Sequence, residues 1–265
     1  RSVPTLACFH AHPDDEAIAT GGTMALAADA GFDVVLIVAT GGEHGEPQPG
    51  VLEHGEELGD RRVKEVREAG AILGASHVEL LDYVDSGMMG EPTNDNPACF
   101  WRADVDEAAG RVAALLTEVG ADVFTIYDSH GGYGHPDHIQ VHRVGLAAAT
   151  LAGVAQVYES TMNRTRIMRQ FAERSDELAA ADIEAPEVSE TETFGTEERF
   201  ITHAVDVRSM IDRKKAAMRA HASQIGPESF FLQFPDDAFA DAFGIEFYIR
   251  HGHQRDGVPM AGSLW

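Results

Sequence analysis

Continuous apolar runs alternate along the chain with segments in which apolar residues recur every three or four positions. The first runs cover residues 5–9 and 33–39, and the segment between them, 16–30, has helical spacing that ends at Gly31. Two apolar strands joined by one helix predict a parallel pair with a right-handed crossover. The same pattern predicts further strands at 77–81, 122–127, 154–159, 200–206 and 245–250, and further helices at 57–73, 104–119, 138–151, 164–180 and 208–221.

This alternation predicts an α/β fold, with a mostly parallel, Rossmann-like sheet covered by helices on both faces. No internal repeat or linker divides the 265 residues, so we expect a single domain. Its Rossmann-like part covers about residues 1–160, and a smaller mixed C-terminal part, about 161–265, is expected to complete the substrate pocket. The acidic stretch 181–199 has few large apolar residues and is expected at the surface.

Chemistry-bearing residues gather directly after the first strand, where His10, His12, Asp14, Asp15 and Glu16 lie within seven positions. The segment 133–138, after the strand at 122–127, repeats this chemistry with Tyr133, His135, Asp137 and His138. Because parallel strands end at one edge of a sheet, the two clusters are expected to lie close together. Two long connections, 40–56 and 82–102, are also expected to be functional, since long loops in a compact domain seldom lack a role.

Together the clusters supply the groups of a metal hydrolase. His12, Asp15 and His138 can give three N/O ligands and leave one position open, the pattern of catalytic zinc. Asp14 is then free to act as a general base on a water whose pKa the metal lowers. His135 with Asp137 forms a second acid/base group and its orienting carboxylate, and Tyr133 can hydrogen-bond an oxyanion.

Structural roles compete with these interpretations. Asp14 and Asp15 could cap the helix that follows them, because carboxylates bind the free amides and the positive dipole end of a helix. His10 is more simply a packed histidine than a ligand, and we leave it out of the metal set. The glycine pairs at 21–22 and 41–42 lack the spacing of a phosphate-binding loop and are expected to form turns.

The amino-acid composition excludes some kinds of binding partner. The net charge of −24 argues against nucleic acid and against an anionic membrane surface, and no apolar run is long enough for a membrane span. Cys8 and Cys99 are the only cysteines, which makes a disulfide framework improbable and fits a reducing compartment. A cytoplasmic protein is the expectation, with self-association into a homo-oligomer left open.

The two clusters, at 12–16 and 134–138, resemble those of the PIG-L/LmbE family of zinc-dependent N-deacetylases, which act on glucosamine-type sugars on a Rossmann-like fold. The likeness extends through residues 40–43, 62–65 and 85–88. Within the family the chain is most similar to the mycothiol branch, through 131–133 and 219–225. The stretch 156–199 matches neither enzyme of that branch, so the resemblance leaves the substrate open.

The resemblance implies metal ligands at His12, Asp15 and His138 and a general base at Asp14. It further implies charge stabilisation or amine protonation by His135, oriented by Asp137, with Tyr133 near the carbonyl oxygen. Sugar or cyclitol contacts are implied at Arg62, Asp85 and Met88. The implied cofactor is zinc, with iron(II) as the alternative in the cell.

The implied substrate is a small N-acyl glucosaminide, cleaved at its amide without a covalent intermediate. A mycothiol S-conjugate amidase is the alternative within the enzyme class. Outside that class, the rival is a nucleotide-binding or non-catalytic Rossmann-like protein, and the missing glycine fingerprint argues against it.

Overall fold

One seven-stranded sheet organises the molecule. The computed structural model describes residues 3–173 and 194–265. The strand order is β3-β2-β1-β4-β5-β7-β6, in which β7 is antiparallel to both of its neighbours and the first five strands are parallel. The predicted α/β class with a mostly parallel sheet is therefore confirmed. The strands are β1 (Thr5–His10), β2 (Asp33–Thr40), β3 (His77–Tyr83), β4 (Val123–Tyr127), β5 (Gln156–Thr161), β6 (His203–Asp206) and β7 (Ile245–Arg250).

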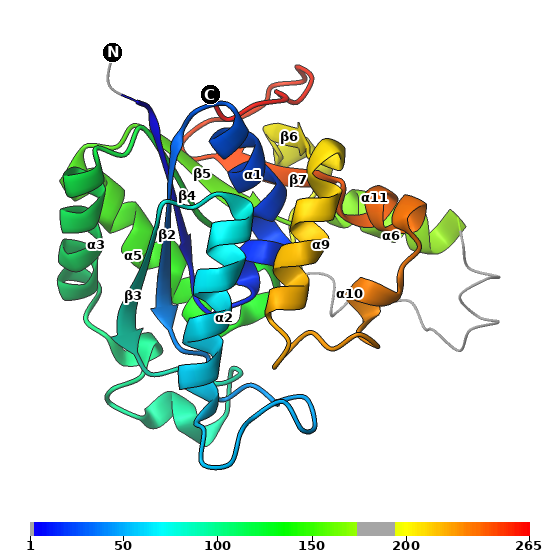
Figure 1. The fold of residues 1–265 in the computed structure, drawn as a ribbon. Helices are drawn as coiled ribbons and strands as arrows, with labels where there is room; N and C mark the ends of the chain where they lie inside the picture. Colours follow the sequence, from blue (N-terminus) through cyan, green and yellow to red (C-terminus); the bar gives the residue numbers. More distant parts are fainter. Residues whose placement is uncertain (1–2, 174–193) are drawn as a thin grey trace.

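Helices cover both faces of this sheet. Figure 1 shows α3 and α5 on one face and α1, α2 and α9 on the other. The helices are α1 (Gly21–Asp29), α2 (Leu58–Leu73), α3 (Val105–Val119), α4 (Gly131–Gly134), α5 (Pro136–Ala152), α6 (Arg164–Glu173), α9 (Ile211–Ala220), α10 (Phe230–Gln233) and α11 (Asp236–Phe243). A π-helical turn, η1 (Glu16–Thr20), and the 3-10 turns η2 (Pro92–Asp95), η3 (Phe100–Arg102), η4 (Glu198–Phe200) and η5 (Arg208–Met210) complete the elements.

The central strand β1 separates two apolar cores. Leu6 and Cys8 pack with the α1, α2 and α9 side, and Ala7 and Phe9 pack with the α3 and α5 side. Successive residues of a strand point to opposite faces of the sheet. All four side chains are fully buried because helices cover both faces. A strand buried on both faces gives the continuous apolar run seen in the sequence.

Several predicted boundaries shift. The helix predicted at 16–30 begins as the π-helical turn η1, a feature often found at functional sites. Helix α5 starts at Pro136, two residues before the predicted start. Strand β6 is shorter than predicted and begins at His203, after the turn η4 has ended at Phe200. Residues 174–193, which include the end of the helix predicted at 164–180 and most of the surface stretch 181–199, lie outside the described residues.

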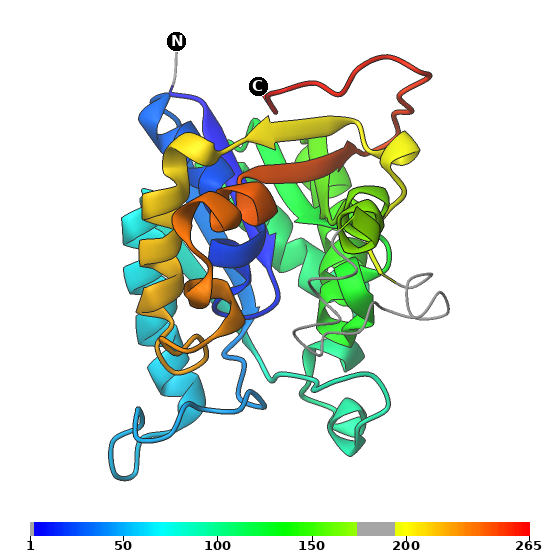
Figure 2. The ribbon, with the colours of Figure 1, turned by 90° about the vertical axis from the view of Figure 1, so that its right-hand side faces the viewer.

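The parallel strands bring both histidine clusters to one edge. Strands β1 and β4 are parallel neighbours, so the segment after His10 and the segment after Tyr127 leave the same edge of the sheet. The long connections after β2 and β3 also leave this edge, at the bottom of the view in Figure 2. Within residues 3–173 and 194–265, no helix combines the length and apolar content needed to cross a bilayer.

Candidate active site

Three donor atoms from β1–η1 and α5 form a compact triangle. His12 Nδ1 lies 3.4 Å from Asp15 Oδ2, His138 Nε2 lies 3.3 Å from the same oxygen, and the two ring nitrogens are 3.4 Å apart. Ligands about 2.0–2.1 Å from a tetrahedral ion stand about 3.3–3.4 Å from one another. The three predicted ligand residues therefore already have the spacing that a tetrahedral ion needs.

The backbone of α4 and the ring of Tyr127 hold His138. Gly131 C=O lies 3.2 Å from His138 Nδ1, so an N–H at that atom donates to the carbonyl and leaves Nε2 free for the triangle. The Tyr127 ring stacks on the imidazole at 4.3 Å with an interplanar angle of 8°. His10 Nδ1 lies 2.9 Å from the Tyr127 hydroxyl, and His10 Nε2 lies 2.8 Å from Thr20 Oγ1. His10 is thus a buried supporting residue, as expected.

Carboxylates surround the other nitrogen of His12. His12 Nε2 lies 3.2 Å from Asp137 Oδ2 and 3.5 Å from Asp85 Oδ1. Asp137 also accepts hydrogen bonds from the Ser86 amide and hydroxyl. The predicted pairing of the Asp137 carboxylate with His135 is therefore corrected: the carboxylate hydrogen-bonds to His12 and Ser86, because the loop after β3 carries Ser86 to the start of α5.

The two adjacent aspartates have opposite electrostatic settings. Burial would raise the pKa of Asp15, but His138 and His12 hold that pKa well below its usual range, so Asp15 is ionised. Burial raises the pKa of Asp14 to about 6, against the lowering effect of Arg62. Asp14 also has a φ of 105°, a strained value for a residue other than glycine, and such strain is concentrated at functional sites.

His135 is held neutral. Burial and the neighbouring His12 and His138 lower the pKa of His135 to about 3. Its Nδ1 accepts a hydrogen bond from the Asp137 amide at 3.1 Å, which places the ring proton of the neutral form on Nε2. His135 can therefore donate a hydrogen bond from Nε2 into the site. Its ring lies 4.6 Å from that of His12, close to the triangle.

The remaining predicted residues differ in exposure. Tyr133 is 47% exposed, and its ring packs edge-on against His138 at 5.0 Å. Met88 is 46% exposed on the loop after β3. Asp85 is buried, and its carboxylate accepts the amides of His44 and Gly87. Tyr133 and Asp85 therefore lie at the triangle, while for Met88 the structure gives only an exposed position on the adjoining loop.

Arg62 is buried behind the site. Its guanidinium donates to the carbonyls of Pro13 and Gly42 at 2.5 and 2.6 Å, and it lies 3.3 Å from Asp14 Oδ2. These contacts fix the two loops that follow β1 and β2 and place a positive charge beside Asp14. The predicted sugar contact of Arg62 stays a prediction, and the structure adds this positioning role.

Distant segments support the first cluster and α2 through contacts that no local motif predicts. His221 Nε2 lies 2.5 Å from Glu16 Oε1, and both groups are fully buried. Ser223 donates from its amide and its hydroxyl to Glu65. The family likeness at 219–225 was the one feature of the sequence that pointed to this segment. It marks the segment that braces the first cluster and α2, and only the folded chain shows this contact.

Other groupings of potential ligands share His12. In the described part of the chain, His12, His135 and His138 can each place one donor atom within 4.8 Å of the others, as can His12, Asp85, His135 and Asp137. These overlapping sets show a dense donor cluster around one point. A His/Asp cluster that could hold a metal ion is therefore present at the carboxyl edge of the sheet.

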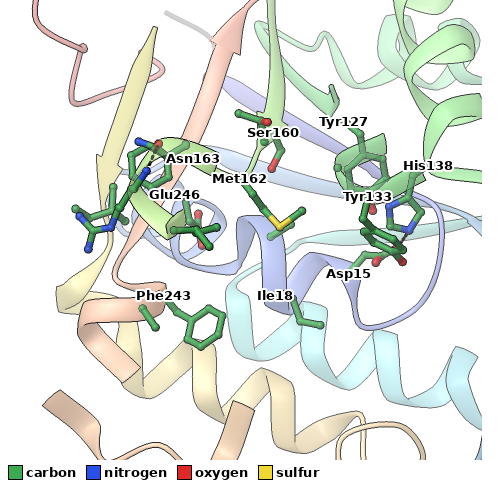
Figure 3. Close-up of a pocket in the computed structure, with 18 of the residues that line it drawn as sticks. Asp15, Ile18, Tyr127, Tyr133, His138, Ser160, Met162, Asn163, Phe243 and Glu246 are labelled. Atoms are coloured by element: carbon green, nitrogen blue, oxygen red, sulfur yellow. Dashed lines mark hydrogen bonds and ion pairs between the residues drawn. The ribbon is translucent and has the colours of Figure 1, made fainter. Parts of the chain in front are cut away.

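A cavity of about 250 Å³ adjoins the triangle. Asp15, Tyr127, Tyr133 and His138 form one end of it, and Figure 3 shows them gathered opposite Phe243, Asn163 and Glu246. Met162 and Ile18 lie between the two groups (Figure 3). The cavity thus extends from the candidate metal site toward the C-terminal elements α11 and β7.

Comparison with known proteins identifies relatives over most of the chain. The chain is 40% identical over 261 residues to the 1D-myo-inositol 2-acetamido-2-deoxy-alpha-D-glucopyranoside deacetylase of Thermomonospora curvata, covering 90% of this chain and 87% of that protein. It is also 40% identical over 262 residues to the enzyme of the same name from Acidothermus cellulolyticus, covering 93% and 88%. Among solved structures, the N,N'-diacetylchitobiose deacetylase from Pyrococcus horikoshii shares the fold, with a TM-score of 0.54, 22% identity and coverage of 91% and 74%.

The family model described as PIG-L, GlcNAc-PI de-N-acetylase, matches residues 7–149. This match spans both histidine clusters, the loops after β2 and β3, and most of α5. It covers more than half of the chain, and the curated relatives extend it to about nine tenths. The chain therefore belongs to the PIG-L family of de-N-acetylases, as the resemblance of its two clusters predicted.

Proposed function

We propose that this protein is a metal-dependent deacetylase that hydrolyses the acetamide of a glucosaminyl-inositol. The observation that carries the proposal is the triangle of His12 Nδ1, Asp15 Oδ2 and His138 Nε2, with all three separations between 3.3 and 3.4 Å. The names of the 40% identical relatives support the substrate, because the similarity covers about nine tenths of this chain. Those names favour the deacetylase over the S-conjugate amidase alternative.

The donor set fits zinc. Two imidazole nitrogens and one ionised carboxylate are ligands that Zn²⁺ prefers, and three protein ligands leave a position open for catalysis. The Asp137 carboxylate at His12 and the Gly131 carbonyl at His138 are the outer partners that orient ligating histidines. The groupings that use His135 instead of Asp15 support the proposal less well, because His135 Nδ1 already accepts the Asp137 amide.

Zn²⁺ in such a site supplies a Lewis acid that polarises the amide carbonyl and lowers the pKa of a bound water toward ~7. We assign the general base to Asp14, which adjoins the proposed ligand Asp15 and has a strained backbone with a φ of 105°. His135, neutral with its proton on Nε2, donates a hydrogen bond to the developing oxyanion, and Asp14 passes the proton that it takes from water to the departing amine. Tyr133 gives a second donor at the same face, and Arg62 positions Asp14.

We place the contacts with the rest of the substrate, beyond the amide, at the loop after β3. Asp85 lies at His12 Nε2, and Met88 is exposed on the same loop after β3; we assign the sugar or cyclitol to these two residues. Arg62 is buried and already donates to two carbonyls, so a sugar contact by Arg62 requires a local rearrangement. Its Nε has no partner among the described residues.

The substitution Asp14→Asn tests the division of roles. It keeps the size of the side chain but removes the proton acceptor, so kcat for amine release from N-acetylglucosaminyl-inositol should fall by about 10²–10⁴-fold. Metal content, measured by elemental analysis, should stay at that of the unaltered protein. His12→Ala is the matched control and should lose both metal and activity. An active Asp14→Asn protein, or one that loses metal as fully as His12→Ala, contradicts the assignment.

A further inference from the structure

The cavity beside the triangle has an apolar lining that the proposed deacetylation does not use. It lies between η1, α6, α11 and β7, and its apolar wall consists of Ile18, Met162, Ile167, Phe243, Ile245 and Phe247. Each of these side chains is only half-buried. An acetyl group has a single methyl, whereas a cavity of about 250 Å³ has room for a considerably longer chain. Apolar walls of this kind favour an apolar occupant.

The cavity lies on one side of the triangle only. Asp15, His138 and Tyr133 line it, whereas Asp85, Met88 and Arg62 do not. His12 stands between the two sides, because its Nδ1 lies at Asp15 and His138 while its Nε2 lies at Asp137 and Asp85. The carbonyl carbon of an amide carries the acyl chain and the nitrogen on opposite sides. A sugar bound at the loop after β3 therefore directs the acyl chain into the cavity.

Two charged groups at the far end of the cavity neutralise each other. Lys214 and Glu246 both line this end of the cavity, and their charged atoms lie 2.5 Å apart. Glu246 also accepts the amides of Gly22 and Thr23. Because these two charges are satisfied by each other and by α1, neither is free to bind a charged acyl group. These two groups therefore do not require a charge at the tip of the chain. Arg166, which also lines the cavity, donates to the Asp241 carbonyl.

We propose that this cavity is an acyl-chain site and that the enzyme hydrolyses N-acyl glucosaminides with unbranched acyl chains longer than acetyl. This inference rests on the proposed amide hydrolysis at the triangle. Water adds to the acyl carbon, the C–N bond breaks, and the amine nitrogen takes the proton. The products are a medium-chain carboxylate, held in the cavity, and the free amino sugar.

The chain-length profile tests the proposal. Amine release is measured from the N-acetyl, N-butyryl and N-hexanoyl forms of glucosaminyl-inositol. Each methylene that leaves water strengthens binding by about fourfold, so kcat/KM for the N-hexanoyl form should equal or exceed that for the N-acetyl form. Hexanoate should also inhibit the N-acetyl reaction more strongly than acetate does, which probes the cavity without requiring cleavage of a long-chain amide.

Substitutions that fill the cavity give a second test of the acyl-chain site. Ile167→Trp on α6 should lower kcat/KM for the N-hexanoyl form by roughly tenfold or more while the N-acetyl value stays within about twofold. It should also remove the advantage of hexanoate over acetate. Met162→Phe is a second filling variant, placed on the connection between β5 and α6. Leu151→Trp is the control, because Leu151 is 65% exposed and does not line the cavity.

The outcomes separate this inference from the proposed function. An enzyme that cleaves the N-acetyl form but shows a steep fall in kcat/KM from acetyl to hexanoyl overturns the acyl-chain site and leaves the deacetylase intact. Equal inhibition by hexanoate and acetate overturns it as well. Absence of activity on every chain length, in a protein that retains its metal, overturns the proposed function itself.

Discussion

At the scale of single residues, Gly131 shows how tightly the proposed metal ligands are constrained. Its φ is +62°, and a Cβ at this position would come within 2.5 Å of His138 Cβ and 2.8 Å of the Ile139 amide nitrogen. The Gly131 carbonyl also orients the His138 ring. Both the backbone conformation and the close approach therefore require glycine, and any side chain here must move His138.

The substitution Gly131→Ala should therefore weaken metal binding. We expect a loss of about 10–100-fold in metal affinity or activity, the range found when the outer partner of a ligating histidine is disturbed. Competition with a metallochromic chelator gives the affinity. Gly110→Ala is the control, because Gly110 lies on α3 with no atom within 4 Å of the added Cβ. Equal metal affinity in the two variants would show that Gly131 does not position His138.

The structure also explains why residue-level prediction was only partly successful. The residues of the triangle could be named from the sequence because histidine and aspartate crowd at two strand ends. The partner of the Asp137 carboxylate was predicted wrongly, because His135 is close in sequence while His12 and Ser86 are close in space. Local spacing does not reveal which of several nearby polar groups a side chain will meet.

At the scale of elements, the start of α1 depends on a distant strand. Thr20 makes no side-chain capping bond, and Glu246 of β7 accepts the free amides of Gly22 and Thr23 instead. The carboxylate also pairs with Lys214 of α9, and both side chains are almost completely buried. The Glu246 carboxylate thus joins β7 to α1 and α9, which cover the same face of the sheet.

We expect Glu246→Ala to be strongly destabilising. Removing the carboxylate leaves the Lys214 ammonium buried without a partner, which costs about 3–5 kcal/mol in the free energy of unfolding. Urea unfolding followed by circular dichroism measures this difference. Arg208→Ala is the control, because it breaks an exposed ion pair with Asp206 that water can replace. A similar midpoint for both variants would contradict the bridging role of Glu246.

At the scale of the whole molecule, the proposed metal site joins two halves of the sheet. His12 and Asp15 follow β1, and His138 lies on α5 after β4. The ligands are separated by more than 120 residues of sequence, yet they lie within 3.4 Å of one another. A metal bound there would add a further link to the β1–β4 pairing and the His12–Asp137 contact, which already join these segments.

Metal removal should therefore lower the unfolding temperature. A ligand bound to the native state alone at 100 times its Kd stabilises that state by about 2.7 kcal/mol, which is a shift of several degrees for a chain of this length. Differential scanning calorimetry with and without a chelator measures the shift. The His12→Ala protein is the control and should not respond to the chelator. An equal response in both proteins would place the stabilising metal elsewhere.

The sequence by itself determined the α/β class, the positions of most strands and helices, and the two clusters that hold the chemistry. It could do so because side-chain periodicity and the residues at strand ends are local properties. Predictions about localisation, domain division and self-association stay predictions. The family assignment also followed from local motifs, at 12–16 and 134–138, and the comparisons confirm it.

Only the tertiary structure decided how these local pieces combine. The separations within the triangle, the carboxylates at His12, the cap of α1 by Glu246 and the apolar cavity all join residues far apart in the chain. Such contacts depend on which faces of the sheet and helices pack together, and a single sequence carries no local signal for them. For this reason the chemistry of the opening cluster was predictable, whereas the room available to the acyl group was not.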